Sequence, residues 1–291
     1  MLVPALALTF NAFVWGVAWW PLRQLESLGL HPLWTTAIAY ALSVAVITVV
    51  RPLSWRQLGG TPALWVLVVG AGVTNASFNW GVTVGDVVRV VLLFYLMPLW
   101  AVLLARALLH ERLTALALFR VALALLGAAI VLWPDDGSGW PWPRATADWL
   151  GLIGGAAFAL NNVMLRHQRN QPEGARALAM LAGGAIVALV LALAIAPPIG
   201  VVVSSNGSAA LWLTGAIALG ALFLLSNLAL QYGAARLSAN ATAVIMLSEV
   251  VFAAVSAVAL GASALTPQVV VGGVLIVAAA AMAALQPAPW A

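Results

Sequence analysis

The chain has 291 residues, of which 64% are hydrophobic and 7% are charged, and its formal net charge at neutral pH is +4. So little polar surface excludes a soluble globular protein and indicates a polytopic membrane protein. The chain has no cysteine, which excludes disulfides and thiolate metal sites. It also lacks the His-Glu-x-x-His, Gly-x-Ser-x-Gly and phosphate-binding Gly-x4-Gly-Lys signatures, so we expect neither an enzyme nor a bound cofactor.

Breaks at proline, glycine and arginine divide the chain into ten apolar segments, most of them near the roughly 20 residues that a helix needs to cross a bilayer. The apolar runs are continuous rather than alternating, which favours helices over barrel strands. We therefore predict an all-α integral membrane protein with ten transmembrane helices. In chain order the predicted spans are Leu2 to Pro21, Pro32 to Val50, Pro62 to Gly81, Val87 to Leu109, Leu113 to Trp133, Ala147 to Leu165, Ala175 to Ala196, Ala209 to Tyr232, Ala239 to Leu260 and Pro267 to Leu285.

The arginines predict the orientation of these spans. Loops on one side would carry Arg51, Arg56, Arg106, Arg112, Arg166, Arg169, Arg176 and Arg236, and loops on the other side Arg23, Arg89 and Arg144. Basic loops stay in the cytoplasm, so we expect a bacterial inner-membrane protein with both termini cytoplasmic. Because the arginines are scattered over short loops, a nucleic-acid partner is not expected.

A weak internal repeat relates residues 75–114 to residues 227–266. Asn75 aligns with Asn227, Gly81 with Gly233, and Leu113-Thr114 with Leu265-Thr266. The alternative is a coincidence of composition. If the repeat is real, its odd number of five spans inverts the second copy and predicts a substrate site between the copies. The domains would then be a first repeat at 1–133, a periplasmic linker at 134–147 and a second, inverted repeat at 148–286.

One carboxylate stands out, because Glu249 is the only charged residue between Leu237 and Ala291 and lies near the middle of the ninth span. A carboxylate in a membrane is costly, so it should face the helix bundle or a water-filled cavity. It is either a proton acceptor or counter-charge for a cationic substrate, or a structural carboxylic acid bonded to a neighbouring helix. Nearer the span ends, Asp86 and Arg89 are expected to pair, and Arg120 to reach toward the cytoplasmic face.

Amide and aromatic side chains inside the spans are the other candidates for substrate binding. The amides Asn75 and Asn79 share one helix face, Asn227 and Gln231 repeat that spacing, and the sixth span adds Asn161. They either form cavity walls or hold helices together. The remaining candidates, which are either packing or substrate contacts, are Trp15, Phe78, Tyr95, Met97 and Trp100. Hinge or close-packing roles are expected for Gly81, Pro98 and Gly233.

Four stretches resemble the EamA family of the drug/metabolite transporter superfamily. They are Tyr95-Leu96-Met97-Pro98, Glu111-Arg112-Leu113-Thr114, Leu247-Ser248-Glu249, and Gln268 with Gly272-Gly273-Val274-Leu275-Ile276. The sequence departs from the family pattern where Val250 replaces an expected proline and where Gly261-Ala262-Ser263-Ala264 lacks a glutamate. These departures put in doubt any hinge or coupling role taken from the family.

The resemblance implies export of a small-molecule substrate across the lipid bilayer by alternating access of two five-helix halves. Within the family the chain looks most like the exporters of aromatic amino acids, although Met97 and Leu160 stand where such an exporter is expected to carry tryptophans. Amides and Glu249 would bind the head group of an amino acid, and aromatic rings its side chain. The alternatives are a different metabolite or drug as cargo, an intramembrane lipid enzyme, and a purely structural membrane subunit.

Overall fold

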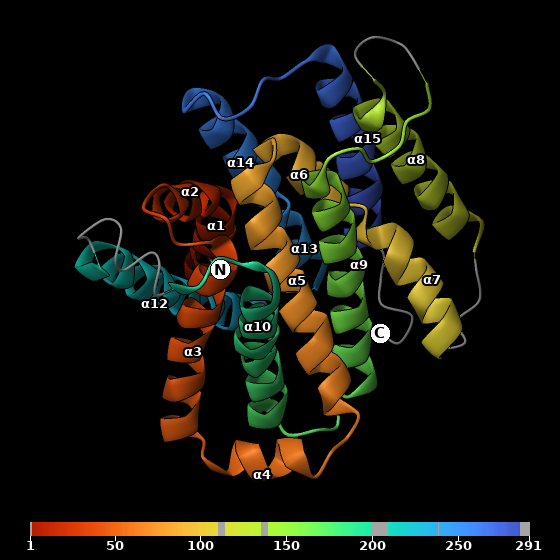
Figure 1. The fold of residues 1–291 in the computed structure, drawn as a ribbon. Coiled ribbons are helices and arrows are strands. Elements are labelled where there is room, and N and C mark those ends of the chain that lie inside the picture. Colours follow the sequence, from red (N-terminus) through yellow and green to blue (C-terminus); the bar gives the residue numbers. More distant parts are fainter. Residues whose placement is uncertain (1, 110–113, 135–138, 200–208, 238, 286–291) are drawn as a thin grey trace.

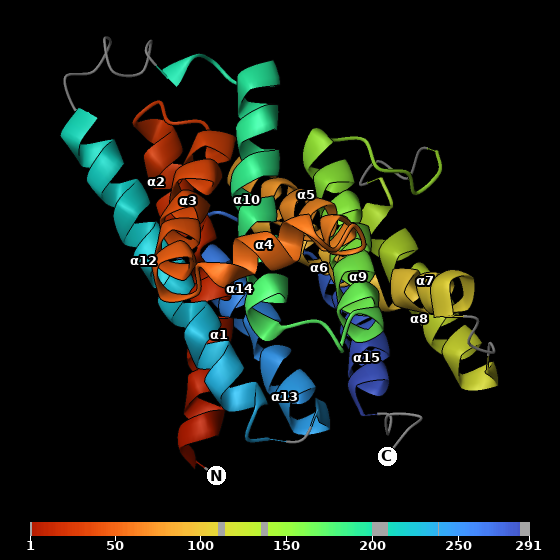
Figure 2. The same cartoon turned by 90° about the horizontal axis from the view of Figure 1, so that it is seen from below.

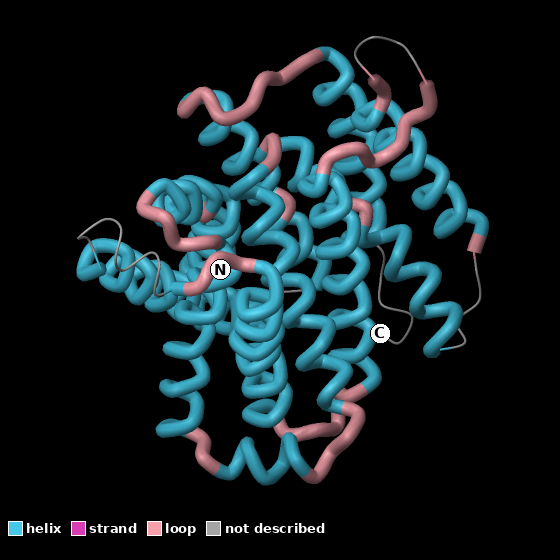
Figure 3. Tube along the Cα trace, viewed as in Figure 1, coloured by secondary structure: helices cyan, strands magenta, loops and turns pink. Residues whose placement is uncertain are grey.

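The computed structural model describes residues 2–109, 114–134, 139–199, 209–237 and 239–285, and the regular elements of these residues are helices (Figures 1 and 3). Helices suit a chain this apolar because each one satisfies its own backbone hydrogen bonds. In chain order they are α1 (Leu2–Val17), α2 (Trp19–Ser27), α3 (Pro32–Val50), α4 (Leu53–Gly59), α5 (Leu64–Val84), α6 (Val87–Phe94), α7 (Met97–Leu109), α8 (Ala115–Leu132), α9 (Thr146–His167), α10 (Glu173–Ile195), α12 (Ala209–Ala234), α13 (Ala239–Met246), α14 (Ser248–Ala259) and α15 (Pro267–Ala284).

Each of the ten predicted spans coincides with helical structure, but not every helix is long and apolar enough to cross a membrane. Among the described residues six segments qualify, and a seventh does if α4 and α5, which meet at 103°, count as one span. The apolar helices at 244–259 and 267–282 are shorter. The structure therefore supports a helical membrane protein, whereas ten crossings stay a prediction.

The first span differs from the prediction because Pro21 does not end it. The helix breaks at Ala18 instead, and α2 then continues to Ser27. Pro21 lies in the first turn of α2, where a missing backbone N–H costs little because that N–H would have no partner in the helix.

Pro98 explains the break between α6 and α7. A proline ring inside a helix clashes with the carbonyl four residues earlier, which here belongs to Phe94, the last residue of α6. The second half breaks at the equivalent place, between Met246 and Ser248, without a proline. There the Ser248 hydroxyl donates to the carbonyl of Ile245 at 2.6 Å, so a side chain satisfies a carbonyl at the end of α13.

The register of the sequence repeat also relates the bounds of two helix pairs. The repeat that aligns Asn75 with Asn227 places the first and last residues of α6 on those of α13, and the bounds of α8 on those of α15. Thr114 and Thr266, which close the sequence repeat, each accept a backbone N–H at the start of the following helix, from Ala117 and Val269 respectively. Residues 111–113, part of the family resemblance, lie outside the described residues.

Helices from the two halves interleave. Helix α5 packs against α9 and α10, α1 packs against α12 and α14, and α8 packs against α15. Figure 2 shows α1, α3 and α12 on one side, α7, α8 and α15 on the other, and α5 and α10 between them. In the predicted repeat α5 corresponds to α12, and α1 corresponds to α9. The contact of α5 with α9 therefore has a counterpart in the contact of α12 with α1, and both occur.

Small residues allow the closest of these approaches. A β-carbon on Gly183 of α10 would overlap the carbonyl of Val68 on α5, and one on Gly127 of α8 would lie 2.6 Å from the carbonyl oxygen of Gly272 on α15. Such contacts bring backbones together in a membrane, where van der Waals packing holds helices to one another.

Candidate functional site

Aromatic rings form a continuous chain through the middle of the bundle. Trp15 of α1 stacks on Phe223 of α12 with ring centroids 4.6 Å apart and an interplanar angle of 13°. Trp15 also meets Phe78 of α5 edge-on at 6.2 Å. Phe78 in turn contacts Phe94 of α6 at 5.0 Å, and Phe94 contacts Phe158 of α9 at 5.4 Å. Because Phe158 and Phe223 come from the second half, this aromatic chain joins the halves twice.

The aromatic chain leads to Glu249 through Tyr95. The Tyr95 ring lies 6.2 Å from Phe94, and its hydroxyl lies 3.3 Å from Oε2 of Glu249 and 3.4 Å from the carbonyl oxygen of Met246. Tyr95 is buried and Glu249 is half-buried. The contact joins the two helix breaks, since Tyr95 follows α6 and Glu249 lies in the first turn of α14. A carboxylate is favoured there because the unpaired N–H groups at a helix start carry partial positive charge.

Helix α1 packs against α14 next to Glu249. A β-carbon on Gly16 would lie 2.8 Å from the carbonyl oxygen of Glu249. Gly16 follows Trp15 directly, so the aromatic chain and the backbone of Glu249 meet α1 at neighbouring positions. The structure thus brings together four of the sequence candidates: Trp15, Phe78, Tyr95 and Glu249.

The amide candidates of the first half are occupied by neighbouring helices. Asn75 Oδ1 accepts from the Tyr40 hydroxyl of α3 at 2.6 Å, and its Nδ2 donates to the carbonyl of Ala71 at 2.8 Å. Asn79 is fully buried and donates to Thr36 Oγ1 of α3 at 3.0 Å. The hydrogen bonds of these two residues are contacts within and between helices.

The amides of the second half do not repeat that arrangement. Asn227 is half-buried, and its Nδ2 donates to the carbonyl of Phe223 one turn earlier at 2.9 Å. Gln231, the counterpart of Asn79, is exposed on α12. Asn161 is buried in α9, packs near Gly70 of α5, and has an Oδ1 atom without a hydrogen-bond partner. The expected matched amide faces are therefore not equivalent.

The other candidates lie at the break between α6 and α7 or where two helices cross. Met97 is half-buried against the hydrophobic core, Pro98 is buried, and Trp100 is half-buried with a buried Nε1 that has no partner. Gly81 lies against α9, where a β-carbon would be 3.2 Å from Leu150 Cβ. Gly233 lies against α1, where a β-carbon would be 2.7 Å from the carbonyl oxygen of Pro4.

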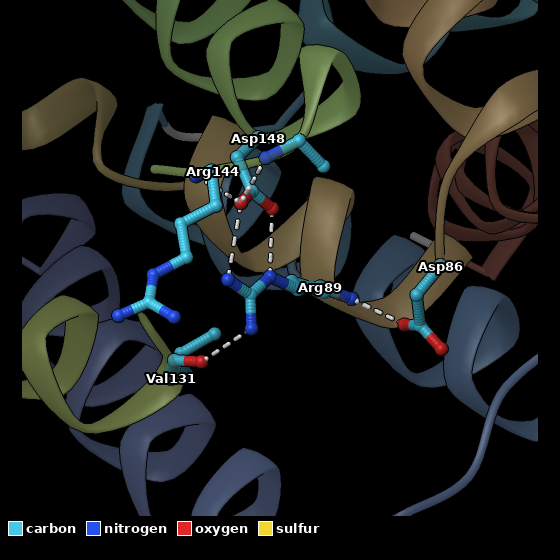
Figure 4. A network of polar contacts seen from close by, with 6 residues as sticks. Asp86, Arg89, Val131, Arg144 and Asp148 are labelled. Carbon is cyan, nitrogen blue, oxygen red and sulfur yellow. Dashed lines mark hydrogen bonds and ion pairs between the residues drawn. The ribbon is translucent and has the colours of Figure 1, made fainter. Parts of the chain in front are cut away.

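The structure describes a cleft at the end of the bundle where the chain passes from α8 to α9, and of the candidates above Gly81 packs next to its lining residues Gly85 and Ala147. We call this end of the bundle the linker end. The cleft has a volume of about 500 Å³, and its lining residues are Val84, Gly85, Asp86, Arg89, Arg144, Ala145, Thr146, Ala147 and Asp148. Figure 4 shows the polar network beside it.

In this network Arg89 does not pair with Asp86, as the sequence spacing suggested, but with Asp148. Its Nε and Nη2 donate to the two carboxylate oxygens at 2.7 and 3.0 Å, and its Nη1 donates to the carbonyl of Val131 at 2.8 Å. Asp86 instead caps α6 by accepting the backbone N–H of Arg89 at 2.9 Å. Cap geometry fixes the Asp86 side chain at the helix start, which leaves the guanidinium to reach across to α9.

Arg120 was expected to reach toward the cytoplasmic face. It is 7% exposed in α8, and its Nη1 lies 3.4 Å from the carbonyl oxygen of Met282 on α15. The side chain therefore contacts a neighbouring helix, and its direction relative to the cytoplasm stays a prediction.

Sequence reasoning did not select Tyr40, Phe94, Phe158, Phe223 or Asn11. Helical spacing could have found three of them, since Asn11 precedes Trp15 by four residues, Phe158 precedes Asn161 by three, and Phe223 precedes Asn227 by four. Asn11 is fully buried and bonds Ser226 across the two halves. Among the described residues, no group of three His, Asp or Glu side chains is placed to hold a metal ion.

Comparison with known proteins bears on the first half. Residues 3–133 match the EamA-like transporter family. The uncharacterized transporter PA0485 of Pseudomonas aeruginosa is 37% identical over 83 residues, which cover 27% of this chain and 28% of that relative. The aligned segment is thus less than a third of the relative's length.

One solved structure, described only as the crystal structure of a protein, has a similar fold. It aligns with a TM-score of 0.56 over 96% of this chain and 96% of its own, at 19% identity. An identity this low shows the fold alone. The match of residues 3–133 to that family and the apolar helices together support a multi-pass membrane protein.

Proposed function

We propose that this chain is an inner-membrane transporter that exports amino acids, aromatic ones and other neutral ones, through a path between its two halves. The observation that carries the proposal is the aromatic chain that ends at Tyr95 and Glu249. It combines apolar rings from five helices with one carboxylate, which suits a molecule with an apolar body and an ammonium group.

The arrangement of the halves supports movement by alternating access. The halves are residues 1–133 and 148–286, joined by a linker near the outer surface, and both termini are cytoplasmic. The shared register of α6 with α13, and of α8 with α15, is what two copies of one unit produce. If the copies are inverted, rocking one half against the other exposes the site near Glu249 to each side in turn.

Efflux from proteoliposomes tests the proposal. Vesicles containing the purified protein and loaded with radiolabelled phenylalanine, threonine or leucine should release at least one of them faster than protein-free vesicles. Glu249→Gln should reduce this release, whereas Glu26→Gln on α2 is the matched control and should not. If no amino acid is released, the cargo is another small molecule and the amino-acid proposal fails.

The same variants decide how transport is driven. If Glu249 carries the coupling proton, release by the native chain depends on a pH gradient and release by Glu249→Gln does not. Unchanged gradient dependence in the variant removes Glu249 as the proton site.

A further inference from the structure

Three arginines on the described helices are engaged away from Glu249. Arg23 donates to the carbonyls of Val82 and Gly85, Arg89 pairs with Asp148, and Arg120 lies against the carbonyl of Met282. For Glu249 the polar side-chain contact is a neutral one, the Tyr95 hydroxyl. A carboxylate inside a membrane protein is costly unless it has a cationic or hydrogen-bonding partner, so this site favours a positively charged guest.

The hydrogen-bond donors described near the aromatic chain are neutral. Nδ2 of Asn11 donates to Ser226, Nδ2 of Asn75 to Ala71, and Nδ2 of Asn227 to Phe223. Nε1 of Trp100 is a buried donor without a partner. Apart from such neutral N–H groups, a carboxylate group of a cargo molecule would meet the like charge of Glu249 rather than a cationic partner.

Acceptors, by contrast, are left over. Oδ1 atoms of Asn11, Asn79 and Asn161 are buried and have no partner, and these side chains are at most 3% exposed. The orientation of Asn11 is set by its bond to a backbone carbonyl, which can only accept, so its free atom is the oxygen. Buried acceptors without partners are uncommon in folded proteins, and a bound donor satisfies them.

Two of these acceptors share a helix face with a ring of the aromatic chain. Asn11 lies one turn before Trp15 on α1, and Asn161 lies one turn after Phe158 on α9. Aromatic faces attract ammonium groups through the ring quadrupole. Rings, free amide oxygens and Glu249 thus offer one kind of chemistry, which is acceptance of a cationic donor.

We infer that the site around Glu249, Tyr95 and Trp15 recognises its cargo through a protonated amine and needs no carboxylate, so that apolar or aromatic organic amines are cargo alongside amino acids. The inference rests on the proposed function for the place of the site and narrows its substrate class. It explains why Glu249 has no counterpart in the first half, where Met97 takes the aligned position of the repeat: one ammonium group needs one counter-charge.

Competition for binding tests the inference without transport. Full-length protein in detergent is titrated with radiolabelled phenethylamine, and unlabelled L-phenylalanine and 3-phenylpropionate compete. Phenethylamine should bind at least as tightly as phenylalanine, and 3-phenylpropionate should be about 100-fold weaker because its carboxylate would lie beside Glu249 without a cationic partner. Glu249→Gln should weaken phenethylamine binding about tenfold or more, and Glu26→Gln should leave it unchanged.

The outcomes separate the two proposals. Displacement by 3-phenylpropionate as strong as by phenethylamine, or unaltered amine binding by a folded Glu249→Gln variant, overturns the inference. If Glu249→Gln does not fold, the competition series on the native chain still decides. Amine binding without release of any amino acid from proteoliposomes removes the amino-acid proposal alone. Amino-acid release without amine binding removes the inference alone.

Discussion

Two polar regions of this molecule use the same kinds of side chain in opposite ways. At the linker end, Arg89 gives three hydrogen bonds, and the carboxylate of Asp148 also accepts the backbone N–H groups of Arg144 and Ala145 at 3.1 and 3.3 Å. At the centre, Glu249 has the Tyr95 hydroxyl at 3.3 Å, and the Oδ1 atoms of Asn11 and Asn161, each one turn from a ring of the aromatic chain, have no partner. At the linker end the polar groups of the ion pair are hydrogen-bonded, whereas at the centre some hydrogen-bond acceptors have no partner.

The difference separates structural from functional polarity. A fully bonded ion pair that joins α6, α8 and α9 holds helices together, and any substitution in it leaves a buried group unpaired. A carboxylate with a single neutral contact contributes little to folding and remains available to a ligand. Stability and binding should therefore respond in opposite ways to substitutions in the two regions.

The largest expected effect is on stability, from Arg89→Ala. The variant leaves the Asp148 carboxylate, whose side chain is 3% exposed, without its guanidinium. Because the guanidinium side chain is itself 28% exposed, the loss should approach but not reach the roughly 3 to 5 kcal/mol typical of a fully buried pair. Thermal unfolding in detergent, followed by circular dichroism, measures the loss. The exposed Arg236, substituted in the same way, is the control and should change little. An unaltered melting temperature for Arg89→Ala would show that the network is not structural.

The second prediction compares neutralised carboxylates. Asp148→Asn should destabilise the protein by about 1.5 to 3 kcal/mol, because hydrogen bonds to a charged group are lost on one side. Glu249→Gln should change stability by less than about 1 kcal/mol, because it removes a charge with no charged partner and keeps an acceptor for Tyr95. Equal losses in both variants would contradict the distinction between the regions.

How far the sequence anticipated these regions depends on the range of the contacts. Local chemistry was readable: Pro98 marks the end of α6 four residues before it, and Thr114 and Thr266 cap the helices that follow them. The match between Thr114 and Thr266 was visible in the repeat alone. Residues with local signals of this kind can be predicted because their partners are neighbours in the chain.

Long-range partners were not readable. Arg89 and Asp148 are 59 residues apart, so the nearer Asp86 seemed the better partner for Arg89 until its cap geometry was known. For Asn79 the sequence left a cavity wall and a helix contact open. Its bond to Thr36 on α3 depends on how α3 and α5 cross, which the sequence does not show. The break between α13 and α14 has no proline from which it could be predicted. In each case helix packing, rather than helix propensity, decides the role of the side chain.

A smaller effect is expected from Tyr95→Phe. The variant keeps the ring against Phe94 and removes the hydroxyl that touches Glu249, at a cost of about 0.5 to 1.5 kcal/mol for one hydrogen bond. Phenethylamine binding should change by less than about fivefold. Tyr40→Phe, which removes the hydroxyl bonded to Asn75, is a matched control that should lose similar stability and leave amine binding unaltered. A greater loss of amine binding in Tyr40→Phe than in Tyr95→Phe would move the recognition site toward α3.

The smallest effect is expected at the start of α3, outside both regions. His31 Nδ1 accepts the backbone N–H of Leu33 at 3.2 Å, and only a neutral ring nitrogen can accept. Burial lowers the pKa of His31. A lowered pKa in the folded state means that the cap contributes fully above the unfolded pKa of about 6.5 and is lost as the pH falls through the folded value. His31→Ala should cost about 1 kcal/mol near pH 8 and less near pH 5, measured by thermal unfolding. A cost for His31→Ala that stays constant with pH would show that the ring packs at this position without acting as a cap.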